Sequence, residues 1–271
     1  MPELPEVETS RRGIEPHIIN KKVTAVIIRQ KKLRWPIPAS LKTQLINQTI
    51  NAVERRGKYI LLRTQAGTVI LHLGMSGSLR ILKKNIAAEK HDHLDIVFSH
   101  NKVLRLRDPR RFGAALWTKS DPLKHKLLKL LGPEPLEDEF SAAYLFAASR
   151  NRKVAIKTFL MNSHIVVGVG NIYANESLFS AGINPKRAAN KISLARYQKL
   201  VTQIKRILKA SIEQGGTTLK DFINEEGKPG YFQQTLAVYG RASEPCIHCA
   251  KPIKQITQAQ RSTFYCVHCQ R

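Results

Sequence analysis

The sequence predicts an α+β fold, with a β-rich N-terminal half, a helical segment after it and a short cysteine-rich tail. Seven short runs in the first half are β-branched or alternate between apolar and polar residues, which is typical of strands. After about residue 140, apolar residues recur at helical spacing instead. The four cysteines all lie in the last 26 residues. Strands followed by helices, rather than alternating with them, indicate the α+β class.

The N-terminal half is expected to start with a helix and to continue as a β-sandwich or flattened barrel. Pro5 suits a first helical position, and Glu6 and Glu8 suit the positive end of the helix dipole. Short strands separated by turns such as QAG and SHNK favour a sandwich or barrel. The expected strands are VTAVII, NAVERR, KYILLRT, TVILHL, LDIVFS, VLRLRD and GAALWT.

The stretch LGPEPLEDEF (131–140) indicates a domain boundary. It is acidic and punctuated by proline and glycine, as linkers and hinges commonly are. We therefore predict a β-sandwich domain, a helical domain and a cysteine-rich ribbon, at residues 1–132, 133–235 and 236–271.

Two helices stand out in the helical domain. The clearer one runs from about Leu194 to Gln214, because Ser193 can cap its first turn, apolar residues line one face, and Gly215 and Gly216 follow it. A shorter helix is expected from about Asn171 to Ala181.

The charge balance indicates a polyanionic partner. The 271 residues include 45 Lys and Arg against 20 Asp and Glu, a formal net charge of +25. Such an excess attracts polyanions and gains from counterion release, so nucleic acid is the first candidate and an anionic membrane surface the second. No apolar run approaches the roughly 18 residues of a spanning helix, and the acidic start is not that of a signal peptide. We expect a monomeric, cytoplasmic protein.

The cysteines predict one structural zinc ion. They form two C-x-x-C pairs separated by sixteen residues, which suits a tetrahedral site of four thiolates. Four protein ligands leave no open position for catalysis. His248 and His268 could substitute as ligands, but we expect them outside the ligand set or exposed. The predicted ligands are Cys246, Cys249, Cys266 and Cys269.

Basic clusters lie in both halves of the chain. Any one could be a solvated surface, but clusters on both sides of a hinge suit a groove that follows a phosphate backbone. Arg261, near an expected hairpin tip between the cysteine pairs, is either solvated or a phosphate contact. VGVGNIY (167–173) places two glycines before a helix start, where exposed N–H groups bind phosphate. The clusters are Arg55, Arg56 and Lys58; Arg105, Arg107, Arg110 and Arg111; and Arg150, Arg152, Lys153 and Lys157.

Two loops carry large apolar residues. Met75 lies between glycines in HLGMSGSLR, and Phe112 follows two arginines in DPRRFGA. Packing in the core is the ordinary explanation. The alternative is a wedge that enters a base stack, kinks DNA and fills the space of an extruded nucleotide.

The opening MPELPEVETS has a chemical interpretation as well as a structural one. Removal of the initiator methionine would leave Pro2 with a secondary amine at the N-terminus. An amine with a pKa of about 8 is partly uncharged at pH 7 and can attack a deoxyribose C1′. The base would then leave, and the resulting iminium would allow the 3′ and 5′ phosphates to be eliminated in turn. Glu3 is placed to act as general acid or base, whereas the structural alternative is a lead-in to the first helix.

Several motifs follow one another along essentially the whole chain: PELPEVET, RRGKY, HLGMSG, EKHDH, DPRRFG, GVGNIY, GGTTLKDF and the closing C-x-x-C pair. In this order they resemble the formamidopyrimidine-DNA glycosylase family. The resemblance implies a bifunctional base-excision repair enzyme that removes 8-oxoguanine and ring-opened purines from duplex DNA and nicks the abasic site by β,δ-elimination. It also implies a β-sandwich with a leading helix, a helical domain with a helix–two-turns–helix element, and a zinc ribbon.

The same resemblance assigns catalytic roles. Pro2 is the implied Schiff-base nucleophile, and Glu3 the acid/base that protonates the sugar ring oxygen. Lys58 matches a lysine beside the lesion phosphate. Arg261 matches a ribbon-tip arginine that grips phosphates and assists elimination.

Further matches concern the DNA. Met75, Arg110 and Phe112 match residues that fill the gap left by the flipped nucleotide, with Arg110 facing the orphaned cytosine. Glu6 matches a buried polar position near the catalytic terminus, and residues 219–232 match a loop that closes over the damaged base. The implied DNA-contacting residues are His91, Arg110, Arg152 or its neighbour Lys153, Lys157 and Asn171.

Two other functions are kept as alternatives. One is an endonuclease VIII-like glycosylase for oxidised pyrimidines, although the PELPE opening and the set of Met75, Arg110 and Phe112 resemble the purine-repair branch. The other is a zinc-ribbon DNA-binding or architectural protein without catalysis, which would share the charge, the ribbon and the wedge. Only the N-terminus argues against it.

Overall fold

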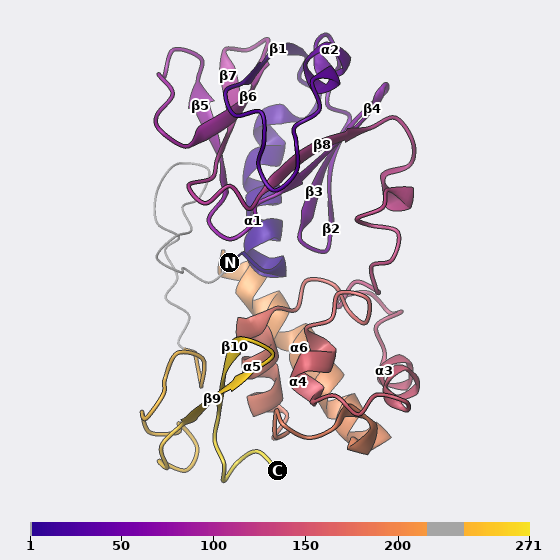
Figure 1. The fold of residues 1–271 in the computed structure, drawn as a ribbon, viewed down its shortest axis with the longest axis vertical. Coiled ribbons are helices and arrows are strands. Elements are labelled where there is room, and N and C mark those ends of the chain that lie inside the picture. The colour runs from indigo at the N-terminus through magenta and orange to yellow at the C-terminus, as the bar shows by residue number, and fades with distance from the viewer. Residues whose placement is uncertain (1, 216–235) are drawn as a thin grey trace. The chain divides into compact units, whose positions relative to one another are not determined.

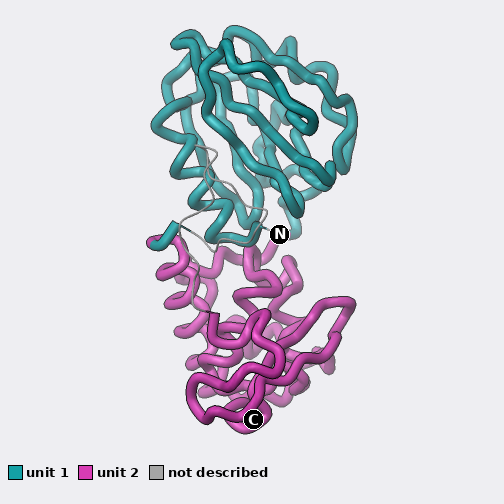
Figure 2. The backbone as a smooth tube through the Cα atoms, turned by 90° about the vertical axis from the view of Figure 1, so that its left-hand side faces the viewer, with its two compact units in different colours: residues 1–130, 214–233 teal, residues 131–213, 234–271 magenta. Residues whose placement is uncertain are grey.

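The computed structural model describes residues 2–215 and 236–271 and divides into two compact units (Figure 2). Among the described residues, the sandwich unit comprises 2–130 with 214–215, and the helical unit comprises 131–213 and 236–271. The loop expected over residues 219–232 lies outside the described residues. The division into three domains stays a prediction.

The sandwich unit packs two four-stranded antiparallel sheets around one core (Figure 1). One sheet has the strand order β1-β6-β7-β5 and the other β2-β3-β4-β8, and helix α1 contacts strands of both. The expected α+β class and leading helix are confirmed. The elements are α1 (Leu4–Ile18), β1 (Val23–Ile28), α2 (Ser40–Leu45), β2 (Ala52–Arg56), β3 (Tyr59–Thr64), β4 (Gly67–His72), β5 (Ser78–Lys83), β6 (Asp92–Phe98), β7 (Lys102–Arg107) and β8 (Ala114–Thr118).

Paired apolar residues of neighbouring strands form the core of this unit. Ile60 of β3 pairs with Leu71 of β4, and Leu62 pairs with Val69; all four side chains are buried. Because successive side chains of a strand point to opposite faces, this pairing directs them toward the same layer. Ile14 of α1 joins the same cluster. Burial of apolar surface therefore holds the helix against the sheets.

Helix α1 begins one residue earlier than expected. It begins at Leu4, so that Pro5 is the second helical residue. Proline is tolerated there because the first N–H groups of a helix have no intrahelical partner. Glu3 is the N-cap and forms a reciprocal capping box with Glu6. The acidic opening therefore starts the helix.

Strand β5 was not predicted from the sequence. It follows a glycine-rich turn, and Arg80 and Lys83 interrupt its apolar pattern. The strand forms because it pairs with β7 at the edge of the sheet. Basic residues are common on such edges, where one side of the strand faces solvent.

The helical unit is built around α5 and α6, which pack on each other, while α6 also packs on α3. Ser193 Oγ accepts a hydrogen bond from the Arg196 N–H at 3.4 Å, as expected for a cap. Turns at residues 161–165 separate α4 from α5. Among the described helices, none has the length and hydrophobicity to cross a membrane. The elements are α3 (Ala142–Ser149), α4 (Ile156–Leu160), α5 (Asn171–Ser180), α6 (Leu194–Glu213), β9 (Lys254–Gln258) and β10 (Arg261–Tyr265).

A buried ion-pair network ties a loop to the first sheet. The guanidinium of Arg105 makes two hydrogen bonds of 2.9 Å with the Asp95 carboxylate and one of 3.3 Å with Asp92. It also donates to the carbonyls of residues 86–87, in the loop before β6. Burial alone would raise the pKa of Asp95, but hydrogen bonds from Arg29 and Arg105 outweigh it and hold that pKa below its ordinary value. The network therefore stays charged near neutral pH.

Arg105→Met is expected to lower the free energy of unfolding by about 3 kcal/mol, because it leaves buried carboxylates without their main partner. Urea unfolding followed by tryptophan fluorescence measures this effect. Both tryptophans of the chain, Trp35 and Trp117, lie in the sandwich unit.

The matched control is Arg63→Met, which removes a half-exposed ion pair with Glu54 in the other sheet. It should cost less than about 1 kcal/mol. Equal losses in the two variants would contradict a stabilising role for the buried network.

Candidate functional site

The N-terminus of α1 holds a buried carboxylate next to Pro2. Pro2, Glu3 and Glu6 are all buried. The backbone N–H of Glu3 donates to Glu6 Oε2 over 2.7 Å, and the Glu3 side chain accepts from the backbone N–H of Glu6. The positive end of the helix dipole stabilises negative charge at this position. The capping box therefore fixes the direction of the Glu3 carboxylate.

Lys58 occupies the tight turn between β2 and β3. Arg56 pairs with Tyr59, so Gly57 and Lys58 form a two-residue turn. Gly57 has a φ of 57°, a left-handed conformation that such hairpin turns require and glycine readily adopts. Lys58 is half-buried. Its side chain therefore projects from a short hairpin rather than from a long loop.

His72, at the end of β4, connects the Lys58 turn to the loop that follows β4. Its Nδ1 accepts the N–H of Gly74 over 3.0 Å, and its ring packs on Tyr59 with centroids 4.8 Å apart. Burial, and then the positive charges of Lys58 and Arg34, lower the pKa of His72 to about 4. The ring is therefore neutral at pH 7 and can accept at Nδ1.

Asp108 joins two loops that lie far apart in the sequence. Its fully buried carboxylate accepts from Ser76 Oγ at 3.1 Å, in the HLGMSG loop (72–77). It also accepts from the backbone N–H of Gly113 at 2.7 Å, in its own DPRRFG loop (108–113). Asp108 and His72 were not among the predicted site residues. Their motifs drew attention to the exposed residues of the loops rather than to the residues that hold them.

The two loops bring DNA-contacting candidates together. The backbone N–H of Asp108 also donates to the His91 carbonyl over 3.0 Å, which adds the loop before β6 to the group. Phe112 is 45% exposed, and the Arg110 guanidinium lies 5.4 Å from the centroid of its ring. Met75 is half-buried. Phe112 therefore lies at the surface rather than in the core.

The hairpin of β9 and β10 carries Arg261 at its tip. Ala259 and Gln260 form the two-residue turn, with φ values of 44° and 60°. Two left-handed residues in succession match the hairpin turn that continues the natural twist of the strands. Arg261 is the first residue of β10 and is exposed. Its expected position near a hairpin tip is confirmed.

Lys157 and Asn171 hold this hairpin from within the helical unit. Lys157 is only 1% exposed, and its Nζ donates to the Ser262 carbonyl at 2.9 Å and to the Thr263 hydroxyl at 2.7 Å. Asn171 Nδ2 donates to the same carbonyl at 3.0 Å. Both residues were predicted to contact DNA. In this structure Lys157 joins α4 to the hairpin, and the phosphate contacts of both residues stay predictions.

Several members of the basic clusters are engaged inside the units. Arg55 and Arg105 pair with buried carboxylates, and Arg150 donates to backbone carbonyls. These three side chains stabilise the fold and leave fewer cations for phosphate. The exposed members include Arg110, Arg111, Arg152 and Lys153.

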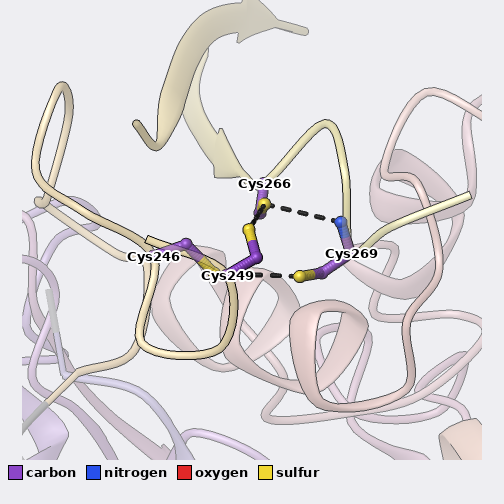
Figure 3. Close-up of side chains that lie close together, drawn as sticks. All are labelled: Cys246, Cys249, Cys266 and Cys269. Carbon is purple, nitrogen blue, oxygen red and sulfur yellow. Dashed lines mark hydrogen bonds between the residues drawn. The ribbon is translucent and has the colours of Figure 1, made fainter. Parts of the chain in front are cut away.

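Four sulfur atoms gather at one end of the β9–β10 ribbon (Figure 3). The Sγ atoms of Cys249 and Cys266 are 3.4 Å apart, and those of Cys246 and Cys269 are 3.9 Å apart. Zn–S bonds of about 2.3 Å place the sulfurs of a tetrahedral site about 3.8 Å from one another, so the arrangement fits zinc. The two histidines within the cysteine pairs are exposed, as expected. The four sulfurs, all within 4.8 Å of one another, belong to Cys246, Cys249, Cys266 and Cys269.

Helix α5 anchors this ribbon through two polar residues that the sequence analysis missed. The Glu176 carboxylate accepts the backbone N–H groups of residues 237–239 over 2.8 to 3.0 Å. Asn175 Oδ1 accepts from the N–H of Phe264 in β10. Both residues are buried within α5. The signal in the sequence was a pair of adjacent polar residues inside the expected helix, because polar residues that become buried must find partners.

Three family models match the chain. Residues 1–115 match the Formamidopyrimidine-DNA glycosylase N-terminal domain, and residues 131–223 match the Formamidopyrimidine-DNA glycosylase H2TH domain. Residues 243–271 match the Zinc finger found in FPG and IleRS. The last match and the four clustered sulfurs agree on one structural zinc ion in the ribbon.

Relatives and solved structures match over the whole length. The formamidopyrimidine-DNA glycosylases of Nitrosococcus oceani and Methylococcus capsulatus are each 56% identical, with 100% of both chains covered. Wild-type Lactococcus lactis Fpg, in complex with DNA containing N7-benzyl-Fapy-dG, gives a TM-score of 0.91 at 33% identity and covers 100% of both chains. A MutM complex with DNA containing carbocyclic 8-oxo-G gives 0.91 at 34% identity, again over 100% of both chains.

The stability of the sandwich unit is expected to fall as the pH drops from 6.5 to about 4. The pKa of His72 is lowered from 6.5 to about 4, so in this range the unfolded chain binds a proton that the folded chain does not. The contribution is complete above pH 6.5 and is lost as the pH approaches the folded-state value. Urea unfolding followed by tryptophan fluorescence, at several pH values between about 4 and about 8, measures it.

His72→Asn is the matched variant, because its amide oxygen keeps an acceptor near the Gly74 N–H but does not titrate. It should flatten this part of the stability curve relative to the wild type. A variant curve parallel to that of the wild type would show that His72 is not the group responsible.

Removal of zinc is expected to unfold the ribbon and to leave the sandwich unit folded. The ribbon has only a small apolar cluster, so metal binding supplies much of its folding free energy. Hydrogen exchange of residues 243–271 should accelerate after chelation. Tryptophan emission, which reports on the sandwich unit alone, should not change.

Two variants test the ligand set by metal analysis. Cys266→Ser should lose the zinc ion, whereas His268→Ala should keep it because that side chain is exposed. Zinc retained by the first variant or lost from the second would show that a histidine replaces a cysteine in the site.

Proposed function

The chain belongs to the formamidopyrimidine-DNA glycosylase family, and from that premise we propose how its residues carry out the reaction. The enzyme is a DNA glycosylase that excises oxidised purines. The observation that carries the mechanism is the buried Glu3 carboxylate, held by the capping box directly beside Pro2.

Pro2 is the proposed nucleophile, once the initiator methionine has been removed. Its nitrogen forms a bond to C1′ of the damaged nucleotide, while the bond to the base breaks and the base takes the electron pair and a proton. The nitrogen then passes its own proton to the Glu3 carboxylate, which becomes the acid for the next step. Glu3, as the acid, protonates the ring oxygen, the C1′–O4′ bond opens, and an iminium joins Pro2 to the sugar.

The iminium then draws electrons from the sugar. Loss of a C2′ proton expels the 3′ phosphate, and a second elimination along the conjugated chain expels the 5′ phosphate. Addition of water to the remaining iminium frees Pro2. We propose that Lys58 and Arg261 bind the flanking phosphates, where a fixed cation stabilises the charge of a leaving phosphate.

Met75, Arg110 and Phe112 are proposed to fill the space of the extruded nucleotide. The exposed Phe112 ring, with Arg110 beside it, is suited to enter a base stack from the surface of the unit. Arg110 would donate hydrogen bonds to the base left without a partner. Contacts to the DNA backbone are assigned to His91, Arg152 or Lys153, Lys157 and Asn171.

The proposed partner is double-stranded DNA that contains an oxidised purine. The net charge of +25 supports this partner through counterion release. All four proposed catalytic residues come from one chain, which supports action as a monomer. A bacterial enzyme that acts on chromosomal DNA works in the cytoplasm, and we place this one there.

The two alternatives have less support. An endonuclease VIII-like preference would favour thymine glycol over 8-oxoguanine opposite cytosine in excision assays, whereas the relatives are named for formamidopyrimidine. A binder without catalysis would not form a covalent intermediate.

Borohydride reduction in the presence of duplex DNA containing 8-oxoguanine opposite cytosine is expected to trap a covalent complex. The reagent converts the iminium into a stable amine, and mass spectrometry of the N-terminal peptide should place the link on Pro2. A mature chain that keeps its methionine, or active protein without an adduct, would end the proposal.

Glu3→Gln is expected to bind lesion DNA but to lose base excision by about 100-fold or more, because the amide cannot donate the required proton. Glu15→Gln, further along the same helix, is the control and should retain activity. Similar excision rates in the two variants would remove Glu3 from its role.

A further inference from the structure

Glu8 and Arg55 form an ion pair that joins helix α1 to the β2–β3 hairpin. Arg55 Nε lies 3.0 Å from Glu8 Oε2, and the two side chains are only 12% and 11% exposed. The same guanidinium donates from Nη1 to the carbonyl of Gly57 over 3.1 Å. Because a guanidinium is planar and rigid, it fixes both contacts at once. Arg55 thus links helix α1 to the backbone of Gly57, the residue immediately before Lys58.

Two further arginines hold the Glu8 carboxylate in place. Arg11 and Arg12 contact it at 3.0 and 2.8 Å, and Arg11 also donates to the Val53 carbonyl of β2. Burial alone would raise the pKa of Glu8, but hydrogen bonds from Arg11 and Arg12 and the charges of Arg11 and Arg55 hold it below 4.5. The carboxylate therefore remains ionised near neutral pH and keeps its position.

The pair also connects to the N-terminus through the helix itself. Glu8 lies five residues beyond Glu3, about 7.5 Å along the axis at about 1.5 Å per residue. A helix of this length is stiff, so Arg55 sets the hairpin turn relative to the capping box that holds Glu3. Since Arg55 also grips Gly57, the backbone at Lys58 has little freedom to move away.

We propose that Glu8 and Arg55 are positioning residues that set where the Lys58 ammonium lies relative to the N-terminal amine. This inference rests on the proposed function, in which Lys58 binds the lesion phosphate while Pro2 attacks the sugar of the same nucleotide. Loss of the Glu8–Arg55 ion pair displaces the Lys58 ammonium from the lesion phosphate. It leaves the reaction of the Pro2 amine with the sugar intact.

Arg55→Lys tests the proposal, because an ammonium keeps the charge but lacks the rigid fork that reaches both Glu8 and Gly57. We expect kcat/KM for excision to fall roughly tenfold, the equivalent of one charge-assisted hydrogen bond. The salt dependence of DNA binding should also become shallower, by about 0.9 in the slope of log K against log salt, as for one lost phosphate contact. A purely structural defect would not change that slope.

A double-mutant cycle with Lys58→Ala decides whether Arg55 acts through Lys58. On the Lys58→Ala background, Arg55→Lys should reduce kcat/KM by less than about twofold, because the contact it positions is already gone. The inference would be overturned if the losses of kcat/KM in the two single variants multiplied in full in the double variant. An unchanged slope of log K against log salt in Arg55→Lys would also overturn it. Arg63→Lys is the matched control: Arg63 lies in the same hairpin but pairs with Glu54 rather than Glu8, and kcat/KM should stay at the wild-type value.

Two further measurements distinguish failure of the positioning role from failure of the proposed function. Glu8→Gln keeps the shape of the Glu8 side chain but removes its charge. It should lower the slope of log K against log salt by the same amount as Arg55→Lys, so the inference can be tested even where Arg55→Lys does not fold. Borohydride trapping through Pro2 reports on the proposed function itself. A trapped adduct together with fully multiplicative effects overturns the positioning role alone, whereas wild-type protein without an adduct overturns the proposed function.

Discussion

A carboxylate can be buried in a protein only where donors surround it, and this constraint sets the positions of the functional loops of the sandwich unit. Glu8 binds α1 to the β2–β3 hairpin, Asp95 with Arg105 holds the loop before β6, and Asp108 joins the HLGMSG and DPRRFG loops. Glu8 and Asp108 each accept from a distant residue, because Arg55 is 47 positions from Glu8 and Ser76 is 32 positions from Asp108. Separation of these contacts would leave a buried carboxylate with fewer donors, and the free-energy cost of that loss holds the loops in place.

The same constraint reduces the number of basic residues that can bind phosphate. A net charge of +25 makes every arginine a candidate for phosphate binding. The structure assigns Arg55 and Arg105 to internal carboxylates and buries Lys157 against the ribbon hairpin. Arg55 and Arg105 therefore stabilise loops of the sandwich unit, and Lys157 holds the hairpin that carries Arg261. An enzyme needs such rigid support to hold its phosphate-binding side chains at a fixed position relative to its nucleophile.

Folding and chemistry also share residues at the N-terminus. Glu3 caps α1 and Glu6 completes the capping box, so the interaction that starts the helix also orients the proposed acid. A general acid must meet the ring oxygen at hydrogen-bond distance, and a helix terminus is a stiffer support than a free tail. The mechanism can therefore use a terminal amine without depending on a mobile terminus.

The sequence by itself determined the α+β class, the zinc ligands and the candidates Pro2 and Glu3, because each follows from a local pattern: the period of a strand, the C-x-x-C spacing or adjacent residues. The edge strand β5 and the partners of the buried ions depended on the tertiary structure. Arg55 and Glu8 are 47 residues apart, and Lys157 and Thr263 are 106 apart. A lysine or arginine has the same local pattern whether it meets a phosphate or a buried oxygen, and only the packing of distant elements decides which of the two it finds.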